Sequence, residues 1–216
     1  MEDLLQKVTS LCKRRGIIFQ NSEIYGGVGG FYDYGPVGVE MKNNLKRYWW
    51  KYMVDKRENV VGIDGTIITH PKVWEASGHV KSFGDEAVEC KKCHTRFRPE
   101  DVEGKCPRCG GTDFTEARKY NLLFNTEIGV VEGDKVPAYL RGEACQTIYL
   151  DFKNVVDSTR QQIPFGIAQI GKAFRNEITP NRFTFRTREF EQWDLQYFVH
   201  PSMMEQAFEY WKSERM

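Results

Sequence analysis

The sequence predicts an α+β fold in which an antiparallel sheet is flanked by helices. Residues 171–199 predict two strands joined by a turn over 178–181, because Pro180 interrupts two runs with a period of two. Apolar residues at helical spacing predict helices over 3–15, 36–54 and 202–216. Two Cys-x2-Cys pairs between residues 90 and 109 add a zinc-ribbon-like insertion to this fold.

The composition is that of an ordinary globular chain. The 216 residues are 40% hydrophobic and 28% charged, which excludes a disordered chain and allows one or two domains. The net charge of +1 provides no long-range field for nucleic acid, so any RNA contact is expected to be a local patch. No apolar run approaches the roughly 20 residues that span a bilayer, so we expect no membrane contact and a cytoplasmic location.

The other elements follow from local signals. Gly16 ends the first helix, and residues 20–35 are expected to form a loop whose glycines lack the Lys-Ser/Thr of a P-loop. Pro36 begins the second helix, whose predicted apolar stripe consists of Val37, Met41, Leu45, Tyr48, Trp49 and Tyr52. A strand is predicted over 60–69, a short strand over 146–150 and a helix over 152–162. The last helix carries an apolar side of Met203, Met204, Ala207, Phe208 and Trp211.

The cysteine spacing favours a metal site. Cys90 and Cys93 form one pair, twelve residues separate them from the pair Cys106 and Cys109, and such paired knuckles complete a tetrahedron. A reducing compartment argues against disulfides. The string from Cys90 to His94 also matches a haem-attachment motif, but the second pair makes that interpretation poor. We therefore predict structural Zn²⁺, with the other two thiols, Cys12 and Cys145, acting as small buried hydrophobes.

The second predicted strand has two different faces. Trp193, Leu195, Tyr197 and Val199 share one parity, whereas Arg186, Arg188, Phe190, Gln192 and Asp194 share the other. Arg175 and Glu177 are likewise predicted to share a face of the first strand. A face with arginines, a carboxylate and a ring suits a planar anion such as ATP. Exposed strand faces are often charged simply because they contact water, so the charged face alone does not distinguish an ATP-binding site from an ordinary solvated surface.

The motifs decide in favour of a known family. Phe174-Arg175-Asn176-Glu177, a loop, and Arg186-Thr187-Arg188-Glu189-Phe190 resemble motif 2 of the class II aminoacyl-tRNA synthetases. The segments 32–38, Tyr-Asp-Tyr-Gly-Pro-Val-Gly, and 140–146, Leu-Arg-Gly-Glu-Ala-Cys-Gln, extend the resemblance to the homodimeric glycyl-tRNA synthetases. The resemblance covers essentially the whole chain.

This resemblance implies ATP-dependent activation of glycine and its transfer to tRNA(Gly), with Mg²⁺ accompanying ATP. Arg175 is the implied catalytic residue, because a guanidinium offers a fork to the α-phosphate and the glycine carboxylate. Glu177 would accept from the adenine amino group, Phe190 would stack on adenine, and Arg186 would hold the distal phosphates. The implied ATP-binding residues are Arg175, Asn176, Glu177, Phe185, Arg186, Thr187, Arg188, Glu189 and Phe190.

For glycine, the resemblance implies two carboxylates that hold the ammonium group, Glu143 and Asp194. At the second position the family more usually has glutamate, so the shorter Asp194 leaves its contact open. The implied glycine-binding residues are Glu143, Phe190, Glu191, Gln192, Trp193, Asp194 and Arg98. Arg141 is a further, weaker candidate.

The domain organisation follows the same resemblance. Residues 1–83 would hold motif 1, which builds the homodimer interface in this family, 84–118 the zinc-binding insertion, and 119–216 motif 2. The third motif and an anticodon-binding domain are expected to be absent, which indicates a fragment of the catalytic domain. Two alternatives stay open, namely a prolyl or threonyl type of class II synthetase, and a non-catalytic paralogue or zinc-ribbon RNA-binding module.

Overall fold

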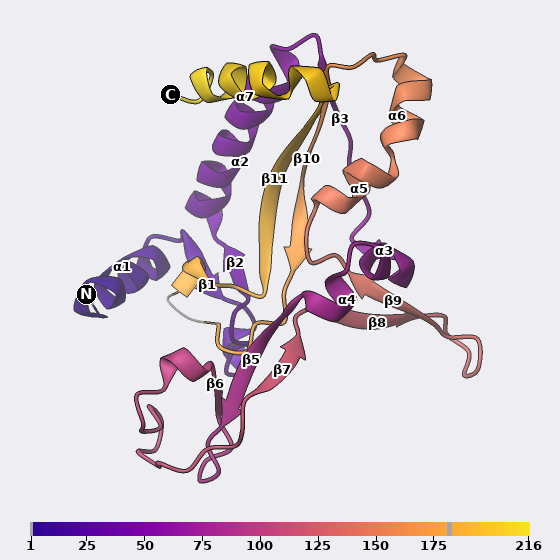
Figure 1. The fold of residues 1–216 in the computed structure, drawn as a ribbon. Helices are drawn as coiled ribbons and strands as arrows, with labels where there is room; N and C mark the ends of the chain where they lie inside the picture. The colour runs from indigo at the N-terminus through magenta and orange to yellow at the C-terminus, as the bar shows by residue number, and fades with distance from the viewer. Residues whose placement is uncertain (1, 181–182) are drawn as a thin grey trace. The chain divides into compact units, whose positions relative to one another are not determined.

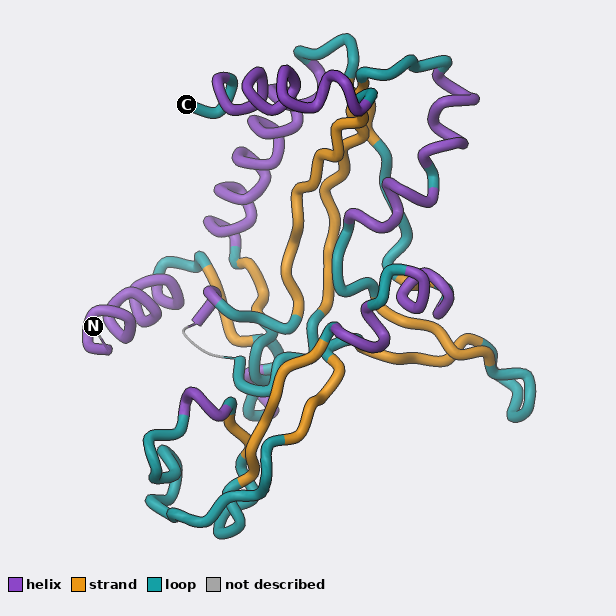
Figure 2. The backbone as a smooth tube through the Cα atoms, viewed as in Figure 1, coloured by secondary structure: helices purple, strands orange, loops and turns teal. Residues whose placement is uncertain are grey.

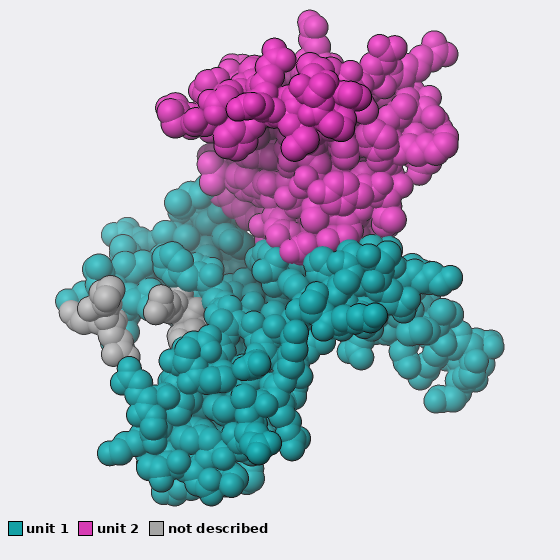
Figure 3. Space-filling model, in the orientation of Figure 1, with its two compact units in different colours: residues 1–41, 67–142, 173–190 teal, residues 42–66, 143–172, 191–216 magenta. Residues whose placement is uncertain are grey.

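The computed structural model describes residues 2–180 and 183–216, and Asn181, at the end of the predicted turn, lies outside them (Figure 1). The chain divides into two compact units (Figure 3). Unit 1 comprises residues 1–41, 67–142 and 173–190, and unit 2 comprises residues 42–66, 143–172 and 191–216. The α+β class is confirmed, since helices alternate along the chain with largely antiparallel sheets. Among the described residues, no helix is long and apolar enough to cross a membrane.

Unit 1 begins with the predicted helix, α1 (Glu2–Arg14), and the chain leaves it at Gly16, whose φ is +65°. The expected loop over 20–35 was wrong in part. It contains a 3₁₀ turn, η1 (Glu23–Tyr25), and two short strands, β1 (Ile18–Gln20) and β2 (Tyr32–Tyr34), pair antiparallel around it. The Gln20 amide holds this turn by donating to the carbonyls of Val28 and Phe31 at 2.6 and 3.0 Å. Side-chain hydrogen bonds of this kind leave no trace in periodicity.

The second predicted helix is confirmed as α2 (Pro36–Trp50), which continues into a π-helical turn, η2 (Lys51–Asp55). Most of its predicted apolar stripe faces solvent rather than a core. Met41 is 58% exposed, Leu45 57% and Tyr48 68%. Trp49 instead points into unit 2, with its ring 6.0 Å from that of Trp193.

The single strand predicted over 60–69 was wrong, because the segment forms two strands in different sheets. β3 (Val60–Gly62) pairs parallel with β10 (Phe165–Phe174), whereas β4 (Ile68–Thr69) pairs antiparallel with β9 (Val136–Leu140). β9 also pairs with β8 (Phe124–Ile128). A side chain at Gly62 would meet the Trp50 ring at 2.3 Å, and one at Gly65 would meet Thr147 at 2.5 Å. These close approaches place the break in the strand.

The rest of unit 1 consists of two short helices, α3 (Pro71–Ala76) and α4 (His79–Ser82), and a three-stranded sheet. The sheet has the order β6-β5-β7, from β6 (Arg96–Phe97), β5 (Gly84–Glu89) and β7 (Arg118–Asn121), with a 3₁₀ turn, η3 (Pro99–Asp101), after β6 (Figure 1). The β5–β7 pairing closes the segment that carries the four cysteines, because Gly84 lies opposite Asn121 and Ala87 opposite Arg118.

Unit 2 shows a further error, because residues 146–150 belong to a helix, α5 (Cys145–Leu150), and not to a strand. A short apolar run does not distinguish the two, and the buried side chains of Thr147 and Ile148 fit a helix here. The helix α6 (Phe152–Thr159) is confirmed and ends at Arg160, whose φ is +58°. Ile148 packs with Val155, Phe165 and Ile167 in the core.

The motif 2 strands are confirmed as β10 and β11 (Glu189–Phe198), in a sheet of order β11-β10-β3 (Figure 2). In unit 2, the alternation of faces on β11 is visible in the contacts. Trp193 meets Trp49 and Tyr197 meets Trp211, whereas the intervening Gln196 accepts from the Tyr149 hydroxyl at 2.9 Å.

The predicted strand ends were wrong. β10 stops at Phe174, so Arg175 and Glu177 do not share a strand face but follow the strand. Arg186 and Arg188 likewise precede β11, after a 3₁₀ turn, η4 (Phe183–Phe185). The backbone reason is a compact turn, in which the Glu177 amide donates to the Arg175 carbonyl at 2.7 Å.

The last predicted helix is confirmed as η5 (Pro201–Met203) followed by α7 (Met204–Ser213). Its predicted apolar side was only partly right. Trp211 packs with its ring 5.3 Å from Tyr197, but Met204 is 62% exposed and Phe208 65% exposed.

Candidate active site and metal centre

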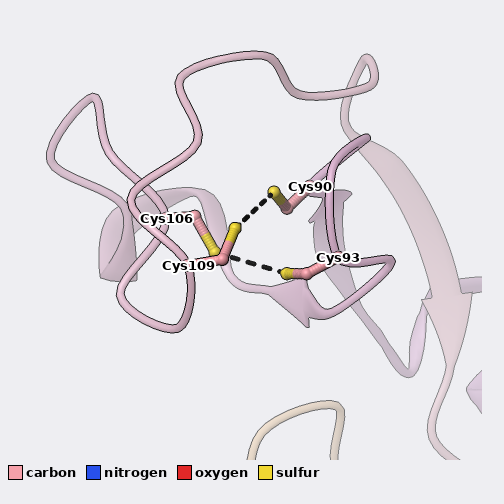
Figure 4. Close-up of side chains that lie close together, drawn as sticks. All are labelled: Cys90, Cys93, Cys106 and Cys109. Atoms are coloured by element: carbon pink, nitrogen blue, oxygen red, sulfur yellow. Dashed lines mark hydrogen bonds between the residues drawn. The ribbon is translucent and has the colours of Figure 1, made fainter.

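The four predicted metal ligands lie together in unit 1 (Figure 4). The Cys90 and Cys109 sulfurs are 3.6 Å apart, as are those of Cys93 and Cys106, and all four lie within 4.8 Å of one another. Sulfurs at about 2.3 Å from a tetrahedral zinc ion lie about 3.8 Å apart, so the four-cysteine site fits zinc. A disulfide would need about 2.05 Å between sulfurs.

The two cysteine knuckles are built alike. In the first, the His94 amide donates to the Cys90 carbonyl at 2.8 Å, and in the second the Gly110 amide donates to the Cys106 carbonyl at 2.9 Å. His94 and Gly110 occupy equivalent positions and both have left-handed backbones, with φ of 55° and 71°. A hydrogen bond with Thr95 lowers the pKa of the Cys93 thiol to about 6, whereas at Cys109 burial and the neighbouring thiols outweigh the Gly111 amide and raise the pKa.

Contacts with two rings and a backbone carbonyl of unit 1 hold Arg175 in place. Its guanidinium carbon lies 5.2 Å from the centre of the Phe190 ring and 5.1 Å from that of Phe83. Its Nε donates to the Gly142 carbonyl at 3.2 Å. The catalytic residue predicted from the sequence is therefore beside the predicted adenine-stacking ring, and Phe83 was missed because nothing in its local sequence marks it.

Glu177 is the centre of a cluster of charges. Its side chain is 7% exposed and accepts from Arg186 Nε at 2.9 Å and from Arg98 Nη2 at 3.3 Å. Both arginines also face the Asp85 carboxylate, which no sequence pattern marks. Arg98, predicted on the glycine side, is thus brought to Glu177 and Asp85.

The predicted ATP-binding residues next to Glu177 donate hydrogen bonds to backbone carbonyls. Arg188 donates from Nε and Nη2 to the Glu177 carbonyl at 3.1 and 2.8 Å. The Asn176 amide donates to the Leu122 carbonyl at 2.8 Å, and the Thr187 hydroxyl donates to the Glu189 carbonyl at 2.8 Å. Phe185, in contrast, is 84% exposed.

In unit 2, Glu143 lies two residues before the first residue of α5. Its Oε2 accepts from the Gln146 amide at 3.0 Å and lies 3.7 Å from the Cys145 sulfur. Gln192 Oε1 accepts from the Ala144 amide at 2.8 Å, which ties the polar face of β11 to this turn. Gln169, a polar residue within the apolar run of β10, is fully buried and donates to the Ala144 carbonyl. A single glutamine within an apolar strand is a signal in the sequence that could have marked Gln169 as a buried hydrogen-bonding residue.

The Cys145 thiol reports on the two predicted ammonium ligands. Burial raises its pKa to about 11, together with the charges of Glu143 and Asp194. A thiol whose ionisation is opposed by two carboxylates lies in a region of negative potential. Such a region in unit 2 favours a cation.

Two of the predicted glycine-binding residues point elsewhere. Glu191 pairs with Lys46 at 2.7 Å and Lys42 at 3.0 Å, and the Trp193 ring packs on Trp49 of the same helix. Burial alone would raise the pKa of Glu191, but the two lysines outweigh it and the pKa is lowered. Their side chains serve the contact between β11 and α2 within unit 2.

Comparison with known proteins places this geometry in a family. Residues 130–215 match the family model of the tRNA synthetase class II core domain (G, H, P, S and T). The chain is 54% identical over 217 residues to a glycine–tRNA ligase of Treponema denticola, covering 98% of the chain and 48% of that relative. The chain belongs to the class II aminoacyl-tRNA synthetases.

Other class II relatives agree. The glycine–tRNA ligase of Borreliella burgdorferi is 52% identical over 219 residues, covering 100% of the chain and 48% of the relative. That of Alkaliphilus oremlandii is 45% identical over 240 residues, covering 98% and 52%. The chain thus spans about half the length of the curated relatives it matches.

The class II fold is also found among solved structures. The structure titled the RNA binding domain of threonyl-tRNA synthetase from Cryptosporidium parvum has a TM-score of 0.58. It is 19% identical, and the match covers 94% of this synthetase chain and 39% of the other. At this identity the likeness concerns the fold alone.

Proposed function

We propose that the protein carrying this chain is a glycine–tRNA ligase, which activates glycine with ATP and transfers it to tRNA(Gly). The observation that carries the proposal is the 54% identity to a glycine–tRNA ligase over 98% of the chain. The residues at the two candidate substrate regions have the chemistry that this reaction needs.

On the nucleotide side, Arg175 is proposed as the catalytic residue. A glycine carboxylate oxygen attacks the α-phosphorus, its new bond forms as the bond to pyrophosphate breaks, and negative charge on the phosphoryl oxygens is neutralised. Arg175 serves this role because the rings of Phe83 and Phe190 orient its guanidinium before substrate arrives. Glu177 is proposed to accept from the adenine amino group and Phe190 to stack on adenine.

Arg186 is proposed to hold the distal phosphates together with the Mg²⁺ that accompanies ATP. Its side chain is 40% exposed, so it is free to leave Glu177 for a stronger anion. Asn176, Thr187, Arg188 and Glu189 shape the backbone on which this site depends, and Phe185 is proposed to cover the nucleotide from its exposed position.

On the amino-acid side, Glu143 and Asp194 are proposed to hold the glycine ammonium. The support is the raised pKa of Cys145, which both carboxylates oppose. Gln192 contributes by fixing the Ala144 amide. Discrimination against larger amino acids would rest on filling the space beside the ammonium.

The remaining proposals concern assembly. Cys90, Cys93, Cys106 and Cys109 would hold structural Zn²⁺, which clamps the ends of a long loop. We propose the same division of the chain as the sequence predicts: residues 1–83 with motif 1, 84–118 as the zinc-binding insertion, and 119–216 with motif 2. A homodimer through α2 is supported by the exposed Leu45 and Tyr48, and a cytoplasmic location by the reduced thiols that the site needs.

Pyrophosphate exchange tests the function. The full-length protein should exchange pyrophosphate into ATP when glycine is present, and not with alanine, proline or threonine. Exchange driven by proline or threonine would move the protein to another class II specificity. No exchange with any amino acid, despite bound ATP, would indicate a non-catalytic paralogue.

A further inference from the structure

Arg98 links the four-cysteine site to the Glu177 carboxylate within unit 1. It directly follows β6, and its neighbour Phe97 is buried against Cys90 and Cys106. The Arg98 side chain itself is only 13% exposed and reaches carboxylates that lie outside the cysteine cluster. The backbone of this residue is thus part of the metal module, whereas its charge is part of the motif 2 region.

The two cations on Glu177 are not equivalent. Arg186 is 40% exposed and, in the proposed function, moves to the phosphates. Arg98 is much less exposed, and its Nη2 contacts both Asp85 and Glu177. A carboxylate as buried as Glu177 needs a fixed cation, because an unpaired buried charge is costly. Arg98 is the cation in the right place to remain when nucleotide binds.

The position of Arg98 depends on the cysteines. β6 is paired with β5 over two residues, Val88 opposite Phe97 and Glu89 opposite Arg96, and the Cys90 amide adds a hydrogen bond to the Thr95 carbonyl at 3.0 Å. So short a pairing is not stable alone. The chain beyond it returns to the cluster at Cys106, whose amide donates to the Gly111 carbonyl at 2.7 Å. Four thiolates around one ion would close the loop between Cys93 and Cys106 and hold β6 in register.

We propose that Arg98 is a positioning residue that fixes the Glu177 carboxylate, so that an intact four-cysteine site strengthens and sharpens nucleotide recognition. The inference rests on the proposed role of Glu177 toward the adenine amino group. It reassigns Arg98 from the glycine side to the nucleotide side. It also gives the cysteine module an effect on the chemistry beyond holding its own loop.

The test compares ATP with inosine triphosphate, which carries an oxygen in place of the exocyclic amino group. Dissociation constants are measured by calorimetry on the full-length protein, with zinc content determined in parallel. Arg98→Ala should weaken ATP binding about tenfold, the scale of one lost hydrogen bond to a charged group. Inosine triphosphate should be affected much less, so the preference for ATP falls. Zinc content should stay near that of the wild type.

Cys106→Ser should lower zinc content and reduce the preference for ATP in the same way. In the Arg98→Ala background, the cysteine substitution should change ATP affinity less than about twofold, because the link is already broken. Arg98→Lys keeps the charge and should restore part of the preference. Arg96→Ala is the matched control, since Arg96 lies two residues away and pairs with Glu89 at 3.0 Å on the surface.

Equal loss of both nucleotides in folded Arg98→Ala and Arg98→Lys would overturn the inference. So would a full effect of Cys106→Ser in the Arg98→Ala background. A wild-type protein that binds neither nucleotide would instead contradict the proposed function itself. Melting curves of each variant separate these outcomes from simple misfolding.

Discussion

The guanidinium carbon of Arg175 lies 5.2 Å from the centre of the Phe190 ring. The same carbon lies 5.1 Å from the centre of the Phe83 ring, and the Arg175 Nε donates to the Gly142 carbonyl. These contacts orient the side chain without any ligand. A charge that is already oriented costs no reorganisation as the reaction proceeds. We therefore expect Arg175 to affect the rate of adenylate formation more than the binding of ATP or glycine.

We expect Arg175→Ala to lower kcat for adenylate formation by about 100-fold or more, the scale of one lost transition-state donor. The Michaelis constants should change less, because the contact strengthens as charge develops. Pyrophosphate exchange measures both. Arg118→Ala, on the exposed side of β7, is the control. An unchanged kcat in Arg175→Ala would remove this residue from the chemistry.

The four-cysteine site predicts a metal stoichiometry. Elemental analysis should find about one zinc per chain, since four thiolates complete one tetrahedral ion. Cys106→Ser should lower the occupancy sharply, whereas Cys12→Ser should not, because Cys12 lies outside the cluster. If zinc content is the same in both variants, the ligand set is wrong.

Glu143→Gln tests the amino-acid side. It preserves shape and removes the charge that would face the glycine ammonium. The Michaelis constant for glycine should rise by a factor that corresponds to about 2–4 kcal/mol, the usual cost of breaking a desolvated pair. The constant for ATP should stay nearly constant. Unchanged glycine kinetics, or a preference for alanine, would contradict the assignment.

The Cys145 thiol gives a readout that needs no substrate. With its pKa raised to about 11 by burial, Glu143 and Asp194, alkylation of Cys145 should reach half its maximal rate near that pH. In the unfolded chain this thiol ionises near pH 8.5. The contribution of Cys145 to the free energy of unfolding is therefore unchanged below that pH, and it falls as the pH rises toward 11, because only the unfolded state then releases the proton. Mass spectrometry after timed alkylation measures the profile.

Glu143→Gln should shift this alkylation profile to lower pH, because one of the two opposing charges is gone. Glu132→Gln, at a side chain that is 96% exposed, should leave it unchanged. An identical profile in wild type and Glu143→Gln would mean that Glu143 does not act on this thiol.

Glu191 predicts an effect on stability rather than on glycine binding. Glu191→Gln leaves Lys42 and Lys46 without their partner and should cost about 1–2 kcal/mol near pH 7, between the values for exposed and buried pairs. Because the folded pKa of Glu191 is lowered, its contribution is full above about pH 4.3 and is lost as the pH falls further. Denaturant unfolding at several pH values measures this, and a glycine Michaelis constant raised without loss of stability would contradict it.

Much of this could be predicted from the sequence, and the errors have a common cause. Long periodic segments such as α2, β10 and β11 were found because their patterns repeat over many residues. Residues 146–150 were mistaken for a strand because a five-residue apolar run fits either element, and only packing of Ile148 in the core decides. The break within 60–69 depends on Trp50 and Thr147, which approach Gly62 and Gly65 from other segments.

The candidate site divides in the same way. The four cysteines were found because their spacing carries the geometry of the ligand set. The place of Arg98 could not be found, because its carboxylate partners, Asp85 and Glu177, lie at separations that no local pattern encodes. Glu191 was assigned to glycine through its neighbours in the motif, although alternate residues on a strand face opposite ways.

The parallel pairing of β3 with β10 sets an order of events during synthesis. Val60 lies opposite Gly166, so β3 leaves the ribosome roughly a hundred residues before its partner exists. At a synthesis rate of about 5–20 residues per second, β3 and the Trp50 ring beside Gly62 remain without their partner strand for about 5–20 s. During that interval the nascent chain presents an open β-edge, which is a binding opportunity for chaperones and a hazard for neighbouring chains on a polysome.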